Sequence, residues 1–168
     1  LLILRKDTPK QALEDRLSRL TKDEWQELYR LSLRLGLLPG VFKQISSLTP
    51  ECVPDQTRVE FINTYFVNLS RNTLLEQELI RILYCFQQKN IPVIPLKGPA
   101  LARFLYQDLA LRATSSDLDL LIKPESISAA EAALQNMGYS SCEKNNLMRI
   151  KKIKYSQQIS FSRQNETR

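Results

Sequence analysis

Residues 56–89 contain no glycine and no proline, and this stretch constrains the fold more than any other feature of the sequence. Its apolar residues recur at helical spacing, from Phe61 through Leu75 to Phe86. Because glycine and proline are the residues that interrupt a helix most strongly, the pattern predicts one long helix with a buried stripe. A helix that breaks near residues 70–72 is the alternative.

The residues before this stretch predict a bundle of shorter helices. Residues 9–20 carry leucines at helical spacing, and Thr21 with Glu24 forms a capping-box pattern that starts a second helix. The second helix ends before a turn at residues 37–40, and a short helix follows at 41–47. The apolar face expected for the second helix consists of Trp25, Leu28, Leu31, Leu33 and Leu35.

The pattern changes at residue 90, where short β-branched and alternating runs replace the long helical pattern. A helical half followed by a half that mixes strands and helices indicates an α bundle leading into an α/β or α+β unit. We therefore expect a helical region at 1–89 and a second region at 90–168. The elements expected in the second region are strands at 91–96, 117–122 and 139–143, helices at 99–106 and 125–137, and a strand or hairpin from 150–154 and 157–161.

The chain has no histidine, which excludes several common kinds of active site. Ser-His-Asp and Cys-His nucleophilic systems, histidine-ligated zinc and histidine general bases all need this side chain. The cysteines, Cys52, Cys85 and Cys142, form no CxxC pair, which argues against a zinc site or a disulfide framework and favours a reducing, cytoplasmic location. No apolar run approaches the ~20 residues of a membrane helix, so we expect no membrane partner.

Most of the net charge of +6 comes from the C-terminal residues. Residues 141–168 hold seven Lys or Arg against two Glu, whereas residues 1–140 are close to neutral. A basic segment can contact phosphates, but more often it is only a solvated face. Tyr155 is the one aromatic residue within 144–155 that could stack on a base, so a nucleic-acid partner is not favoured.

Asp117 and Asp119 are the residues that point most directly to chemistry. In a strand, side chains two residues apart project from the same face, with Cα atoms roughly 6–7 Å apart. Two carboxylates placed in this way can converge on a divalent ion, and hard oxygen ligands suit Mg²⁺ bound together with substrate phosphates. A solvent-facing strand that happens to carry two acids is the alternative, because a short motif is weak evidence on its own.

Lys97 and Gly98 stand between an expected strand and an expected helix. Glycine lets the backbone approach a ligand closely, and the following helix N-terminus offers free N–H groups and the positive end of its dipole. Lys97 would add charge to a phosphate site there. An ordinary turn, with Gly98 as N-cap and Pro99 in the first helical turn, is the alternative. Together, the turn and the acidic pair place phosphate binding and metal binding within one strand–helix–strand unit.

The stretch IPVIPLKGPALARFLYQDLALRATSSDLDLLIKP, residues 91–124, resembles the core of the uncharacterised-type nucleotidyltransferase family in the DNA polymerase beta superfamily. In that family an LKG segment leads through a tyrosine-containing helix and an Arg-Ser/Gly loop to DLDLLV. The helices before this stretch and the later helix ending at Gly138-Tyr139 are similar in layout. The resemblance implies an α+β fold in which an N-terminal helical bundle precedes a partial, polymerase beta-like mixed sheet with flanking helices.

The resemblance also implies a function. Asp117 and Asp119 would be the catalytic pair that binds Mg²⁺ and, through it, the nucleotide phosphates. The nucleotide-binding residues that the resemblance implies are Lys97, Gly98, Arg112, Ser115 and Ser116. The implied reaction is Mg²⁺-dependent transfer of a nucleoside monophosphate from an NTP to an unknown hydroxyl acceptor, with two ions orienting the acceptor and the leaving pyrophosphate.

One carboxylate expected from the superfamily is not found in this sequence. Members usually supply a third acid from a later strand, whereas the last acid here, Glu166, stands in a tail-like setting. We therefore interpret the chain as a fragment with an incomplete nucleotidyltransferase-like core. The alternative function is a non-catalytic protein-interaction module with a degenerate nucleotidyltransferase-like fold.

Overall fold

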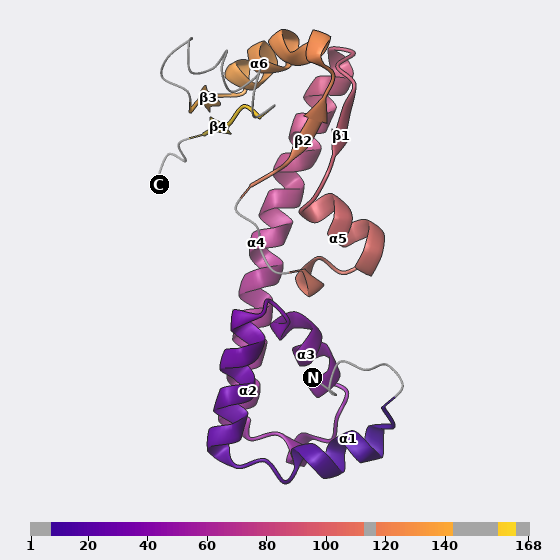
Figure 1. Cartoon of the computed structure of the whole chain (residues 1–168), viewed down its shortest axis with the longest axis vertical. Helices are drawn as coiled ribbons and strands as arrows, with labels where there is room; N and C mark the ends of the chain where they lie inside the picture. The colour runs from indigo at the N-terminus through magenta and orange to yellow at the C-terminus, as the bar shows by residue number, and fades with distance from the viewer. Residues whose placement is uncertain (1–7, 113–116, 143–157, 164–168) are drawn as a thin grey trace. The chain divides into compact units, whose positions relative to one another are not determined.

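The computed structural model describes residues 8–112, 117–142 and 158–163 (Figure 1). The helices are α1 Lys10–Leu17, α2 Lys22–Arg34, α3 Leu38–Ile45, α4 Asp55–Gln88, α5 Pro99–Tyr106 and α6 Ile127–Asn136, with short 3₁₀ helices η2 Pro50–Cys52, η3 Leu109–Leu111 and η4 Pro124–Ser126. The strands are β1 Val93–Pro95, β2 Leu120–Ile122, β3 Ser140–Ser141 and β4 Phe161–Ser162. Helices predominate and the sheets are small and antiparallel, so the predicted α+β class is confirmed.

The start of α2 is fixed by the predicted capping box. The Thr21 hydroxyl accepts a hydrogen bond from the Glu24 amide at 3.3 Å, and the Glu24 carboxylate accepts one from the Thr21 amide at 2.8 Å. Each bond satisfies an N–H group that the helix itself leaves without a partner. Both hydrogen bonds join residues that are three apart in the sequence, which is why the identities of these two residues are enough to predict them.

A hydrophobic core joins α1, α2, α3 and the first turns of α4. Trp25 at 1% exposure and Phe61 at 0% are its largest members. Its buried residues are Leu13, Leu17, Trp25, Leu38, Val41, Ile45, Leu48, Val53 and Phe61. The apolar face predicted for α2 is partly wrong, because Leu33 and Leu35 are 53% and 50% exposed. Ser32 is buried instead, and its hydroxyl donates to the Leu28 carbonyl at 2.6 Å.

The structure also tests the turn predicted at 37–40 and the possible break in the long helix at 70–72. The turn expected at 37–40 is wrong, since α3 already begins at Leu38 with Pro39 in its first turn, where a proline costs no hydrogen bond. The long helix predicted for 56–89 is confirmed as α4, and it continues through residues 70–72 without a break. Asn72, in the segment where a break was considered, is buried and bonded to another part of the chain.

The chain divides into two compact units. The first contains the described residues up to Leu79 and those from Pro95 to Asp119, and the second contains Ile80–Ile94 and the described residues from Leu120 onward. All described residues of the candidate site belong to the first unit. Among the described residues of the second unit, the buried apolar side chains are Ile82, Phe86, Ile91, Ala130, Ala133 and Leu134. The predicted division into regions at residue 89 stays a prediction.

The strands form two separate two-stranded sheets. β1 pairs with β2, and β3 pairs with β4 in an antiparallel register that sets Ser141 opposite Phe161. The strand predicted at 117–122 is shorter than expected, because β2 begins only at Leu120. Asp117 and Asp119 therefore lie in the extended segment that leads into β2, not within the strand itself.

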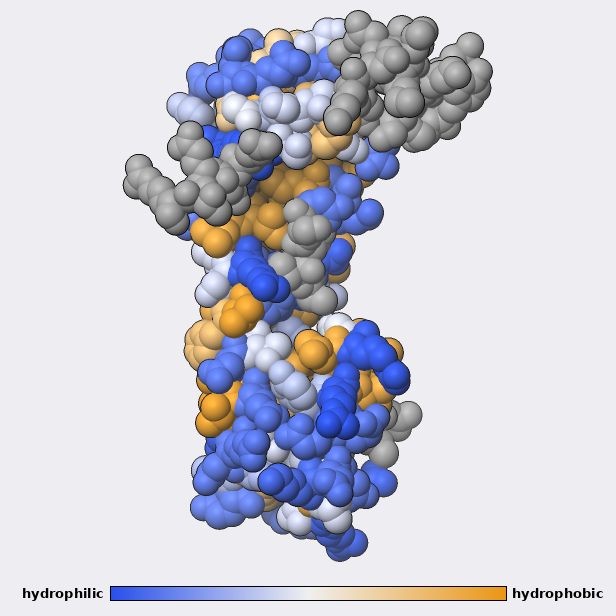
Figure 2. Space-filling model, turned by 90° about the vertical axis from the view of Figure 1, so that its left-hand side faces the viewer, coloured by the Kyte–Doolittle hydropathy of each residue, from blue (hydrophilic) through white to orange (hydrophobic). Residues whose placement is uncertain are grey.

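Several large apolar side chains remain on the surface of the described parts. Phe104 on α5 is 82% exposed and Leu74 on α4 is 66% exposed. Orange areas in Figure 2 show such side chains interrupting a largely hydrophilic surface. Among the described residues, no helix combines the length and the apolar character that crossing a bilayer requires.

Candidate active site

The turn between β1 and α5 has a backbone conformation that requires glycine. Gly98 is buried and adopts φ 65° and ψ −138°, a region that side chains with a Cβ atom rarely occupy. A Cβ atom added there would lie 3.8 Å from the Asp117 carbonyl oxygen, which is an ordinary contact distance. Conformation rather than lack of space therefore selects glycine, and the turn passes directly beside the acidic segment.

Lys97 and Asp119 connect this turn to the acidic segment. The Lys97 Nζ atom lies 3.0 Å from Asp119 Oδ2, and the Leu96 amide donates to the Asp119 carbonyl at 2.9 Å. The backbone bond extends the β1–β2 pairing by one residue beyond the strands. The Lys97 side chain is 65% exposed, so solvent screens the ion pair and its contribution to stability is small.

Asp117 and Asp119 have unequal surroundings. Asp117 is exposed, whereas the Asp119 side chain is 28% exposed and carries the contact with Lys97. Within the described parts of the chain, no group of three or more cysteine, aspartate or glutamate side chains is placed to share a metal ion. Glu166, the late acid of the sequence, lies outside the described residues.

The chemistry of these donors fits Mg²⁺. Mg²⁺ typically takes one or two protein carboxylates and completes its shell with water and substrate phosphates, so two aspartates are an adequate protein contribution. The Lys97 ammonium at Asp119 Oδ2 shows that a cation is already accommodated at this carboxylate. A bound metal ion would share Asp119 with Lys97 or displace it toward a phosphate.

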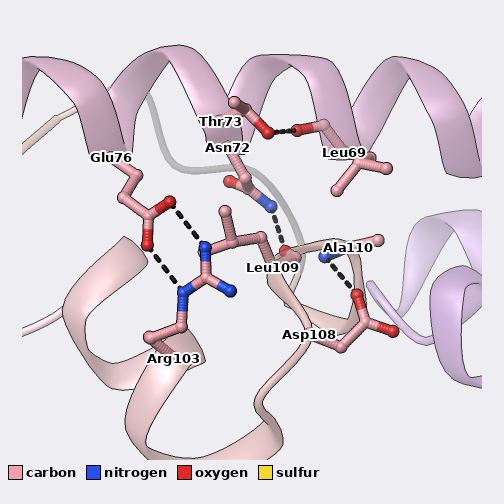
Figure 3. Close-up of polar contacts among 8 residues, drawn as sticks. All are labelled: Leu69, Asn72, Thr73, Glu76, Arg103, Asp108, Leu109 and Ala110. Carbon is pink, nitrogen blue, oxygen red and sulfur yellow. Dashed lines mark hydrogen bonds and ion pairs between the residues drawn. The ribbon is translucent and has the colours of Figure 1, made fainter.

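The loop after α5 is held by Asp108. Its carboxylate caps η3 by accepting from the Ala110 amide at 2.9 Å, as Figure 3 shows. It also accepts from the Tyr65 hydroxyl at 3.3 Å and lies 3.8 Å from Lys43 Nζ. Burial and then the nearby Asp108 charge raise the pKa of the Tyr65 phenol above its ordinary value, so Tyr65 stays a hydrogen-bond donor at neutral pH.

Arg103 and Glu76 fasten α5 to α4 in the same region. The guanidinium makes a two-pronged contact with the carboxylate, with Nε at 2.8 Å from Oε1 and one terminal nitrogen at 2.7 Å from Oε2 (Figure 3). The hydrogen bonds and the charge of Glu76 raise the pKa of Arg103 above its ordinary value. Paired contacts of this kind fix orientation as well as distance.

An open groove of ≈ 630 Å³ lies against these two contacts. Its walls combine two tyrosines with paired acidic and basic side chains. The lining residues are Lys43, Tyr65, Leu69, Thr73, Glu76, Arg103, Tyr106, Gln107, Asp108 and Leu109. The groove does not include the acidic pair or Gly98, so it is a separate feature of the first unit.

Asn68 and Asn72 of α4 are residues that the sequence analysis missed. The Asn68 side-chain amide donates to the carbonyls of Ala110 and Arg112 at 2.7 and 2.8 Å. The Asn72 amide donates to those of Leu109 and Arg112 at 2.7 and 2.9 Å. Two asparagines four residues apart share one face of a helix, and that spacing inside an otherwise apolar pattern is the signal that could have identified them.

The remaining predicted site residues differ in what the structure shows of them. Arg112 follows η3, and its Nε atom is buried without a hydrogen-bond partner among the described residues. Ser115 and Ser116 lie outside the described residues and stay predictions. The structure thus brings together Lys97, Gly98, Asp117 and Asp119, and it leaves the phosphate-binding roles as predictions.

Comparison with known proteins gives one family. The model of a family described as "Uncharacterised nucleotidyltransferase" matches residues 21–167. The match spans α2 to α4, the β1–α5 turn and the acidic segment, and it supports nucleotidyl transfer as the general activity. No curated protein and no solved structure matches the chain.

Proposed function

This chain belongs to the uncharacterised nucleotidyltransferase family, and from that premise we propose that it transfers a nucleoside monophosphate from an NTP to a hydroxyl acceptor with the help of Mg²⁺. The acceptor oxygen forms a bond to the α-phosphorus and releases its proton to solvent, while the bond from that phosphorus to the bridging oxygen breaks and pyrophosphate leaves with the electron pair. Such a displacement needs positioning and charge stabilisation more than covalent help from the protein.

One observation carries the proposal, namely that the turn before α5 and the acidic segment before β2 meet. Lys97 Nζ lies 3.0 Å from Asp119 Oδ2, and the Gly98 turn packs beside the Asp117 carbonyl. Phosphates and divalent ions bind together, so a site for both needs cationic and anionic groups within a few ångströms. The two segments supply these groups although about twenty residues of sequence separate them.

Each residue of the site has a distinct role in the proposal. Asp117 and Asp119 would hold Mg²⁺, which neutralises charge on the triphosphate and polarises its oxygens. Gly98 lets the first turn of α5 approach a phosphate, where its N–H groups and dipole favour negative charge. Lys97 and Arg112 would pair with phosphate oxygens that carry charge not balanced by the metal.

A thermal-shift experiment with the four common NTPs tests this function. We expect one or more NTPs at millimolar concentration to raise the melting temperature of the wild-type chain only when Mg²⁺ is present, because ligands that bind the folded state stabilise it. The double variant Asp117→Asn with Asp119→Asn keeps the side-chain shape and loses the charges, and it should lose the shift. Asp23→Asn, an exposed residue on α2, is the matched control and should keep it. No shift with any NTP would contradict the proposal.

A further inference from the structure

Two of the three asparagines of α4, Asn68 and Asn72, stand in the middle of the helix, where they add little to helix stability. Asparagine has a poor helix propensity, and Asn72 is only 3% exposed. A polar side chain buried in this way needs hydrogen-bond partners, and the side-chain amides of Asn68 and Asn72 donate four hydrogen bonds to carbonyls outside α4. Asn68 and Asn72 therefore stabilise the segment 109–112 to which they bond, and they do not stabilise α4 itself.

The two amides hold the backbone of the loop that leads to the acidic pair. Each amide nitrogen carries two hydrogens, and each donates to two carbonyls. The carbonyl of Arg112 accepts from both asparagines, at 2.8 and 2.9 Å. Arg112 is also the point where the chain leaves η3 in an extended conformation, with φ −98° and ψ 132°. The asparagines thus fix the position from which the Arg112 side chain starts.

The Arg112 side chain has a donor that nothing in the described chain satisfies. Its Nε atom is buried and has no hydrogen-bond partner among the described residues. An unsatisfied buried donor is costly, and guanidinium groups are well suited to bind phosphate oxygens through two parallel bonds. A bound anionic group would supply the missing partner.

From these contacts we infer that Asn68 and Asn72 are positioning residues, which hold the Arg112 backbone so that its guanidinium can bind a nucleotide phosphate. The inference rests on the proposed function for the identity of the anion. It adds two residues of α4 that touch neither metal nor nucleotide and act only through Arg112. Arg112 lies five residues before Asp117 in the sequence.

A double-mutant cycle separates positioning from a merely structural role. Isothermal titration calorimetry with Mg·ATP should show about tenfold weaker binding for Asn72→Ala and for Asn68→Ala, since each removes two hydrogen bonds that order the loop. In an Arg112→Ala background the same substitutions should change affinity less than about twofold, because the residue through which they act is gone. Asn63→Ala, at an exposed position of the same helix, should leave affinity unchanged.

Limited proteolysis gives a second measurement that does not depend on nucleotide. Trypsin cleaves after Arg112, and the carbonyl of that bond is the one held by both asparagines. We expect the cleavage after Arg112, followed by mass spectrometry, to be at least several-fold faster in Asn68→Ala than in wild type or Asn63→Ala. Asn68 is only half-buried, so this variant remains informative if Asn72→Ala fails to fold.

The outcomes distinguish the inference from the proposed function. Wild-type Mg·ATP binding that the asparagine variants retain would overturn the inference and leave the function standing. If the asparagine substitutions weakened Mg·ATP binding equally in the wild-type and the Arg112→Ala background, the inference would be overturned as well. If the wild type binds inorganic pyrophosphate, but not Mg·ATP, and the binding depends on Arg112 and both asparagines, the inference holds and the function fails. Binding of neither ligand would overturn both.

Discussion

The Lys97 ammonium lies 3.0 Å from Oδ2 of Asp119, in a structure where the Leu96 amide already binds the Asp119 carbonyl at 2.9 Å. Backbone and side chain therefore connect the turn before α5 to the acidic segment before β2. In the proposed reaction Lys97 occupies a carboxylate that Mg²⁺ would also use. Lys97 and Mg²⁺ would then compete for the Asp119 carboxylate when no nucleotide is bound. Both would bind phosphate oxygens when a nucleotide is present.

Replacing Lys97 should change metal binding and nucleotide binding in opposite directions. Lys97→Ala removes a competing cation, so we expect binding of Mg²⁺ alone to strengthen by at most about fivefold, as the small worth of an exposed ion pair dictates. Binding of Mg·ATP should weaken by about tenfold, because a charged hydrogen-bond donor to phosphate is lost. Calorimetric titrations with each ligand measure both effects, and Lys123→Ala, another exposed lysine, is the control. If Lys97→Ala changed the affinities for Mg²⁺ and for Mg·ATP in the same direction, Lys97 and Mg²⁺ would not be competing for Asp119.

Replacing Gly98 should destabilise the fold through backbone strain. Gly98→Ala places a Cβ atom on a residue with φ 65° and ψ −138°, which we expect to lower the free energy of unfolding by about 1–3 kcal/mol. The matched control is Gly40→Ala within α3, where φ is not positive and alanine should be neutral or stabilising by up to about 1 kcal/mol. Urea denaturation monitored by circular dichroism measures both. An equal effect of the two substitutions would argue against strain at Gly98.

The capping box of α2 should make stability depend on pH. Hydrogen bonds from the Thr21 amide and hydroxyl lower the pKa of Glu24 below its ordinary value of 4.5. A lowered pKa in the folded state means that the stabilisation is present above about pH 4.5 and is lost as the pH falls through the depressed value. Glu24→Ala should therefore melt at a lower temperature than wild type at pH 7, and the difference should shrink below pH 4.5.

Glu27→Ala provides the comparison for this effect, because Glu27 is exposed on the same helix and makes no bond with Thr21. Its melting temperature should stay closer to that of wild type at pH 7. Thermal melts followed by circular dichroism between pH 3 and 7 give the full profile. A Glu24→Ala difference that stays constant over this range would show that the charged carboxylate is not what stabilises the helix start.

Helix positions were predictable from sequence where the deciding contacts are local. Thr21 and Glu24 satisfy each other's groups within three residues, and the apolar spacing in 56–89, with no glycine or proline, predicts α4. The exposure of Leu33 and Leu35 could not be predicted in this way. It depends on which helices cover α2, and periodicity alone does not specify the covering partner.

The candidate site was predictable in part for a similar reason. Two short motifs predicted most of the site, the Lys97-Gly98 turn and the acidic pair Asp117 and Asp119. These residues lie together in the structure. The start of β2 at Leu120 was not predictable, because the length of a strand depends on its pairing with a distant segment. Asn68 and Asn72 were missed because their partners are backbone carbonyls about forty residues away, which leave no trace in composition.

Direct titration of Mg·ATP tests most directly whether Asp117 and Asp119 hold a metal–nucleotide complex. We expect wild type and the control Asp23→Asn to bind with equal affinity in Mg²⁺ and not at all in excess EDTA. Asp117→Asn and Asp119→Asn should each weaken binding by at least about tenfold, since each removes a charged oxygen ligand from the ion. Undiminished Mg²⁺-dependent binding by the double variant would contradict the account.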